Sequence, residues 1–196
     1  MGGIRFTYAL SGVVLMAACS EPMSVPEQME PPVRMSFQAQ TTLNFGAILS
    51  GSEEVPPVTT KARGNALFQV EPAGEEMEFR LIVANLENVI QAHIHCGPRG
   101  VNGPVVLWLY PPAPPSALIP GRSDGILSHG TATAADVIAR PDSPACPGGV
   151  ANMADLIAKM HTGGVYVNVH TSAFPAGEIR GQIQGRGGGF QVRGTS

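Results

Sequence analysis

Turn signals recur at short intervals along this chain, and their spacing constrains the fold more than any other feature. From residue 41 onward, runs of alternating apolar and polar residues end in Gly- or Pro-rich stretches such as SGSEEVPPV and PPAPPS. The 24 glycines and 18 prolines, beside 14% charged residues, suit many short strands joined by turns and suit a helical protein poorly. We therefore predict an all-β domain over residues 41–185, an antiparallel Greek-key β-sandwich.

Two local features refine this prediction. The stretch NLEN, residues 85–88, predicts a tight turn between a strand in EMEFRLIVANL and a strand in NVIQAHIHC. The segment ANMADLIAKMHTGG departs from alternation, because its apolar residues recur at the i, i+3, i+4, i+7 spacing of a helix. Asn152 can cap its start and Gly163 its end, so we predict one short helix over the end of the sandwich.

The N-terminus has the pattern of an export signal. Arg5 precedes the apolar run FTYALSGVVLMAA, which is short for a bilayer span and fits a signal peptide over residues 1–18. The run ends in LMAAC, which resembles the lipobox of bacterial lipoproteins and implies a lipid-modified Cys19. Residues 19–40 are Pro-rich and typical of a tether. We therefore expect a lipid-anchored protein of the bacterial cell envelope; the alternative is a secreted protein cleaved after Ala18.

Two cysteines remain for the domain itself. Cys96 and Cys146 form an even pair in a chain expected in an oxidising compartment, which favours a disulfide bond. The alternatives are two free buried thiols, or a Cys96 that belongs to a metal site. The Gly-rich residues 186–196 follow the last predicted strand and are expected to form a flexible tail.

Three of the five histidines lie in two strand-like runs, QAHIHCG and VYVNVHT. Successive side chains of a strand point to opposite faces, so an apolar face in each run leaves His93, His95 and His170 on the other side. In GEIRGQI the same alternation leaves Glu178 and Arg180 opposite the apolar residues. If the three strands are neighbours, the outer face of one sheet gathers three imidazoles, a carboxylate and a guanidinium.

Five short motifs occur in order along the chain: EVPPV, AHIHCG, NGPVV, VNVHT and GEIRGQ. Together they resemble the CHRD domain, named for its repeats in the animal protein chordin and also present in bacterial secreted proteins, across nearly the whole predicted domain. The resemblance implies little about activity, because the biochemical role of the family is largely undefined. Chordin binds growth factors, so the resemblance implies a binding module with a protein partner in addition to the membrane.

The H-x-H run and the later V-H run are also similar to the copper-ligand strands of Cu/Zn superoxide dismutases, which implies a sandwich of that kind or an immunoglobulin-like one. The loop GPRGVNGP has neither His nor Asp, so the similarity implies a mononuclear site at most. Imidazole suits Cu, Zn or Ni. The metal hypothesis uses the polar side chains of this face, with His93, His95, His170 and Glu178 as ligands and Asn168 and Arg180 beside them. The alternative is a hydrogen-bonded network of the same side chains without a metal.

Several functions are disfavoured. A net charge of −3 without a basic patch, and a single tryptophan, Trp108, argue against nucleic-acid binding. No nucleophile motif is recognisable, and GRGGGF follows the last strand instead of forming a phosphate loop, so a non-enzymatic role is favoured. The leading hypothesis is a lipid-anchored binding module of undefined ligand with room for one metal ion. The alternatives are a periplasmic Cu- or Zn-binding protein for storage, resistance or delivery, and, least favoured, a dismutase-like redox enzyme.

Overall fold

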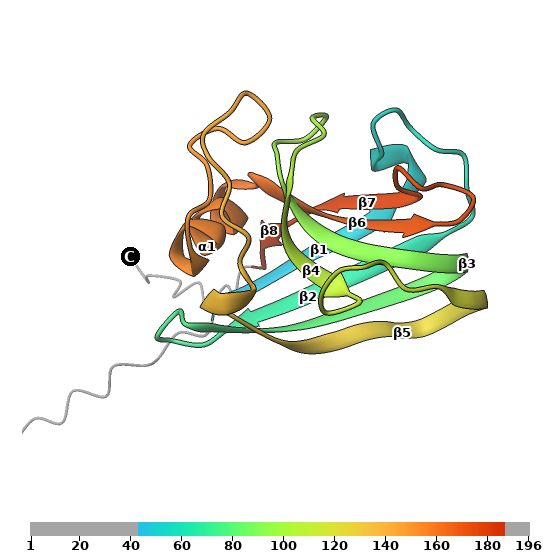
Figure 1. Ribbon diagram of the computed structural model, residues 1–196, viewed down its shortest axis with the longest axis horizontal. Helices are drawn as coiled ribbons and strands as arrows, with labels where there is room; N and C mark the ends of the chain where they lie inside the picture. Colours follow the sequence, from blue (N-terminus) through green and yellow to red (C-terminus); the bar gives the residue numbers. More distant parts are fainter. Residues whose placement is uncertain (1–42, 187–196) are drawn as a thin grey trace, which may run out of the picture. The chain divides into compact units, whose positions relative to one another are not determined.

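The computed structural model in Figure 1 describes residues 43–186. The predicted signal peptide, Cys19, the tether and the tail beyond Arg186 lie outside the described residues, so those predictions stay predictions. Within residues 43–186, no helix is long and apolar enough to cross a membrane. The elements of the described part are β1 (Leu43–Ser50), η1 (Gly51–Glu53), β2 (Arg63–Val70), β3 (Glu76–Cys96), β4 (Val105–Tyr110), β5 (Ile119–Thr133), η2 (Ala134–Asp136), α1 (Met153–Thr162), β6 (Val165–Thr171), β7 (Ile179–Gln182) and β8 (Gln184–Gly185).

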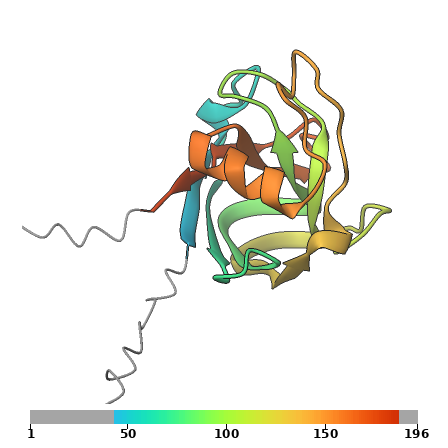
Figure 2. The same cartoon turned by 90° about the vertical axis from the view of Figure 1, so that its left-hand side faces the viewer.

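The strand pairings close into a ring. β1 pairs with β2, β2 with the first part of β3, the second part of β3 with β6, and β6 with β7. β7 then reaches β1 through the pair Ser50 and Arg180. β5 and β4 extend the other edge of β3. All of these pairings are antiparallel, which confirms the predicted all-β fold, and Figure 2 shows the strands curving around one interior.

β3 differs from the prediction, because the chain does not turn back at residues 85–88. It runs on as one strand of 21 residues. Asn85 and Asn88 adopt positive φ angles of 59° and 53°, and the pairing with β5 shifts register between Val83 and Leu86 and again between Glu87 and Val89. Asparagine tolerates this conformation better than most residues, so the two positions form bulges that bend the strand. The bend lets one strand pair with β2 at its start and with β6 at its end.

The helix agrees with the prediction at both ends. The side chain of Asn152 accepts a hydrogen bond from the backbone N–H of Asp155, and Gly163 ends the helix in the left-handed conformation with φ of 68°. The face predicted to be apolar is buried in the core: Met153, Leu156, Ile157 and Met160. α1 lies across one end of the ring of strands (Figure 2), where it contacts β6 and β8.

Candidate metal centre

Three neighbouring strands, β3, β6 and β7, place polar side chains in register on one face of the sheet. The rows of paired residues are His95 with Tyr166 and Gln182, His93 with Asn168 and Arg180, and Gln91 with His170. The other face of the same strands is apolar and has no exposed surface: Ala92, Ile94, Val165, Val167, Val169 and Ile179. The predicted alternation is therefore correct, and the three strands are neighbours. We call the first of these surfaces the polar face.

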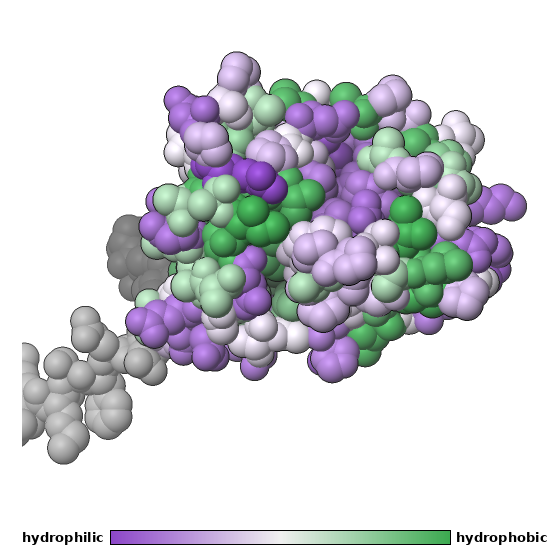
Figure 3. Space-filling model, in the orientation of Figure 1, coloured by the Kyte–Doolittle hydropathy of each residue, from purple (hydrophilic) through white to green (hydrophobic). Residues whose placement is uncertain are grey.

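The polar face is covered, although the sequence suggested an outer face. His93 is 2% exposed, His170 6% and Arg180 1%, while His95 is half-buried. Two loops contact this face, residues 51–61 after β1 through Asn168 and residues 97–104 after β3 through His95 and Arg180, and we call them the loop cover. The two loops are joined by an ion pair between Arg99 and Glu53 and by a 2.7 Å hydrogen bond from Asn102 Nδ2 to the carbonyl of Val55. Figure 3 shows hydrophilic residues gathered between the two loops at the top of the view.

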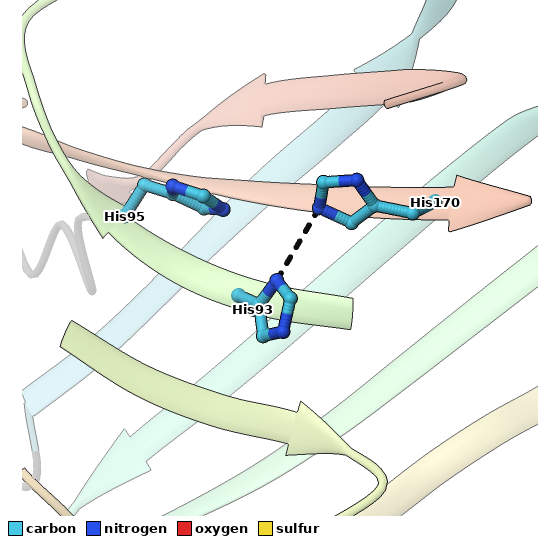
Figure 4. A group of neighbouring side chains, drawn as sticks. All are labelled: His93, His95 and His170. Atoms are coloured by element: carbon cyan, nitrogen blue, oxygen red, sulfur yellow. Dashed lines mark hydrogen bonds between the residues drawn. The ribbon is translucent and has the colours of Figure 1, made fainter. Parts of the chain in front are cut away.

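The three imidazoles converge on one another from β3 and β6 (Figure 4). His93 Nδ1 lies 3.3 Å from His170 Nε2. One ligand nitrogen from each of His93, His95 and His170 lies within 4.8 Å of the others. The two histidines of β3 are two residues apart and therefore on the same face, and His170 faces them from β6, so strand pairing brings the rings together.

Backbone carbonyls fix the tautomers of two of these histidines. His95 Nδ1 lies 2.9 Å from the carbonyl oxygen of Gly103, and His170 Nδ1 lies 2.9 Å from that of Pro175. A carbonyl oxygen only accepts hydrogen bonds, so both Nδ1 atoms carry the proton and both Nε2 atoms present a lone pair. His170 Nε2 accepts from His93 Nδ1 in this arrangement, whereas His95 Nε2 is buried without a protein partner.

Burial keeps these imidazoles neutral. It lowers the pKa of His93 to about 3, with a smaller contribution from the neighbouring His170 and His95. It also lowers the pKa of His95 to about 4, against an opposing effect of the hydrogen bond to Gly103. The pKa of His170 is lowered for the same main reason, against the hydrogen bond to Pro175. Neutral imidazole is the form that binds metal, so the site needs no deprotonation at neutral pH.

Aromatic rings hold two of the imidazoles in place. Tyr166 stacks on His95 with ring centroids 5.0 Å apart and an angle of 9° between the planes. Trp108 of β4 meets His93 edge to face at 4.2 Å. The Tyr166 hydroxyl also accepts a 3.1 Å hydrogen bond from the backbone N–H of Gly103, the residue whose carbonyl orients His95. These contacts restrict ring rotation around the site.

Glu178, predicted as a fourth ligand, does not join this group. One of its carboxylate oxygens accepts a 2.7 Å hydrogen bond from the hydroxyl of Thr60, and the other a 2.8 Å hydrogen bond from that of Thr171. Strand alternation placed the residue correctly next to the polar face, but it could not show which partner the carboxylate would take. The cluster of possible metal ligands is His93, His95 and His170 without it.

Arg180 and Asn168 lie in the same row of the sheet as His93 and form hydrogen bonds with the loop cover. The Arg180 guanidinium donates to the carbonyl oxygens of Pro98 and Val101 and to Asn102 Oδ1, at 3.0–3.2 Å. Its central carbon also lies 3.4 Å from the centroid of the Tyr166 ring, a cation–π contact. The Asn168 amide donates to the carboxyl group of Glu54.

The sequence did not reveal that Glu54 and the backbone carbonyls of Gly103 and Pro175 belong to the site. Glu54 is 5% exposed, and burial raises its pKa to about 7, against the lowering effects of Arg180 and Asn168. The one signal available was its place in the motif EVPPV. The carbonyls of Gly103 and Pro175 have no side-chain signal, because every residue has a carbonyl.

The two remaining cysteines form the predicted disulfide bond, which closes a separation of 50 residues. Both residues are fully buried. Cys96 directly follows His95, so the bond fixes the end of β3 beside the site. It also removes Cys96 from the possible metal ligands.

Comparison with known proteins agrees with the motif resemblance. The family model of the CHRD domain matches residues 45–183. No curated protein and no solved structure matches the chain. The matched range contains every residue of the polar face and both segments of the loop cover.

Proposed function

Because this chain belongs to the CHRD domain family, we propose that its domain is a binding module of the bacterial cell envelope that holds one copper or zinc ion through His93, His95 and His170. The main observation behind this proposal is the pair of fixed tautomers. Metal-bound histidines commonly donate their second N–H to a carbonyl or carboxylate, which orients the ring and its lone pair. His95 and His170 both have this arrangement.

The spacing of the nitrogens supports the proposal. Metal–nitrogen bonds of about 2.0–2.1 Å at tetrahedral or trigonal angles place two ligand nitrogens about 3.3–3.6 Å apart. The 3.3 Å between His93 Nδ1 and His170 Nε2 already has this value, and binding through His93 Nδ1 would require its proton to move to Nε2 of the same ring. The other separations are at most 4.8 Å, so binding requires a shift of about 1 Å, which ring rotation supplies.

A purely structural network explains the site less well. Buried polar atoms in folded proteins are almost always hydrogen-bonded. The Nε2 atoms of His93 and His95 have no protein partner, although both are buried. A metal ion bound to His95 Nε2 would use the lone pair that the network leaves unpaired.

A lipid on Cys19, as the motif LMAAC predicts, would place this module at a membrane of the cell envelope. Residues 19–40 would separate the domain from the bilayer, so the ion would be held outside the cytoplasm for storage or delivery. No catalytic step is needed for such a role.

Metal titration of the full-length protein, purified in detergent, tests the proposal. Trp108 is the one tryptophan of the chain, and its ring lies 4.2 Å from that of His93, so its fluorescence reports on the site. We expect saturation at one equivalent of copper or zinc, confirmed by elemental analysis. His129→Ala, at an exposed position of β5, is the matched control and should bind normally. Saturable binding that survives replacement of both His93 and His170 by alanine would contradict the proposal.

A further inference from the structure

We infer that the three-histidine site selects Cu(I) over Zn(II) and Cu(II). This inference rests on the proposed metal-binding function and specifies which charge of the ion the site prefers.

The first argument is the charge of the ligands. Three neutral imidazoles bring no negative charge to the ion. The two buried carboxyl groups of the described residues are occupied elsewhere, Glu178 by the hydroxyls of Thr60 and Thr171 and Glu54 by the amide of Asn168. Cys96 is in a disulfide bond and supplies no thiolate. The ligand set therefore leaves the charge of the ion uncompensated.

The second argument is the surroundings of the ligands. His93 and His170 are 2% and 6% exposed, so the bound ion would lose most of its contact with water. A fixed positive charge is also near, because the Arg180 guanidinium lies over the ring of Tyr166, which stacks on His95. The cost of burying an ion rises with the square of its charge, so a dication costs about four times as much as a monocation. Both effects favour the ion of lower charge.

The third argument is the number of ligands. Protein-bound zinc is almost always four-coordinate, and a three-residue site needs a further ligand such as water. Zn(II) and Cu(I) both have a filled d shell, but Cu(I) carries the lower charge and is stable with two or three ligands. The described residues offer three nitrogens and no fourth donor in the cluster. Trp108 and Tyr166 pack against two of the three rings, which favours a compact trigonal site.

Competition titrations decide the question. The dissociation constant for Cu(I) is measured against bathocuproine disulfonate, with ascorbate as reductant and without oxygen, and that for Zn(II) against a chromophoric zinc chelator. The variant with alanine at His93 and His170 gives the background from thioethers and from Cys19. We expect Cu(I) to bind at least about 100-fold more tightly than Zn(II). Equal or tighter binding of Zn(II) by the wild type would overturn the inference but not the proposed function. If the wild type binds neither ion more tightly than the double alanine variant does, both are overturned.

A charge variant tests the cause. Gln91 lies in β3, directly opposite His170 of β6 in the strand register. Gln91→Glu therefore adds a negative charge beside the site with almost no change of shape. We expect this variant to tighten Zn(II) binding and to lower the preference for Cu(I) at least about tenfold. Gln69→Glu, at an exposed position of β2, adds the same charge away from the site and should leave the preference unchanged. An unchanged preference in Gln91→Glu, or an equal change in both variants, would overturn the charge argument.

Discussion

The side-chain amide of Asn168 donates hydrogen bonds to both carboxyl oxygens of Glu54, at 2.9 Å and 3.0 Å, across 114 residues of sequence. The contact joins the first loop of the cover to the middle of β6, next to His93 in the strand register. Burial raises the pKa of Glu54 to about 7, although Arg180 and Asn168 both act to lower it. A titratable group therefore helps to hold the cover over the histidines.

The first prediction concerns the pH dependence of stability. The pKa of Glu54 is higher in the folded protein, about 7, than its ordinary value of 4.5. The stabilising effect of the bound proton is therefore complete below about pH 4.5 and is lost as the pH rises through 7. The difference between the two values corresponds to about 3 kcal/mol. In Glu54→Gln this loss should be absent, so the variant gains stability relative to wild type between pH 4.5 and pH 8.5.

Urea unfolding at those two pH values measures the effect. Glu53→Gln is the matched control, because Glu53 is adjacent in sequence but pairs with Arg99 at the surface. A difference between wild type and Glu54→Gln that does not change with pH would show that the carboxyl group titrates normally.

The second prediction concerns Arg180. The residue is 1% exposed, and its guanidinium makes three hydrogen bonds to residues 98–102. Arg180→Met should lower the free energy of unfolding by about 3 kcal/mol, because buried acceptors lose a charged donor. Arg99→Met, which removes a surface ion pair of the same cover, should cost about 1 kcal/mol or less. Hydrogen exchange should rise within residues 97–104 in the first variant and stay near wild type in the second; equal costs in the two variants would contradict this account.

The third prediction concerns the disulfide bond. The bond between Cys96 and Cys146 closes a separation of 50 residues, which in the chain-entropy model stabilises the fold by about 4 kcal/mol. The double variant with alanine at both positions should unfold at correspondingly lower urea concentration. Intact mass after alkylation, with and without reductant, verifies the bond in the wild type. Two cysteines that alkylate freely in the native protein would disprove it.

The sequence could predict which side chains of each strand face the core and which face the site, because they alternate along the strand. Val165, Val167 and Val169 face the core and Tyr166, Asn168 and His170 face the other way, as a period of two requires. This pattern is local, so it needs no knowledge of the rest of the chain. The helix ends at Asn152 and Gly163 were predictable for the same reason, since each cap acts within one turn.

The loop cover could not be predicted, because it depends on contacts between residues far apart in sequence. Glu53 and Glu54 are adjacent carboxylates, yet one forms a surface ion pair and the other lies buried against Asn168. Nothing in their residue type distinguishes them. The bend at Asn85 and Asn88 was misread for a related reason, since a positive φ angle serves a turn and a bulge equally well.

The fourth prediction concerns the membrane anchor. The motif LMAAC predicts that Cys19 is the first residue of the mature protein and is modified by lipid. Metabolic labelling with a radioactive fatty acid should label the wild type, and Cys19→Ser should abolish the label. His129→Ala, at an exposed position of β5, is the control and should keep it. An unmodified N-terminus at residue 19 in the purified wild type would favour simple secretion.

The last prediction concerns the stability that a bound metal ion adds. An ion that binds only the folded state stabilises it by about 4 kcal/mol when its free concentration is 1,000 times the dissociation constant. We expect the wild type to show this gain in urea unfolding with saturating metal, and His129→Ala to show it equally. Replacement of His93 and His170 by alanine should abolish the gain. The double variant should also be less stable without metal, because both side chains are buried. The two effects are separable, since only the metal-dependent difference within each protein reports on the site. A metal-dependent gain that persists in the double variant would place the binding elsewhere in the chain.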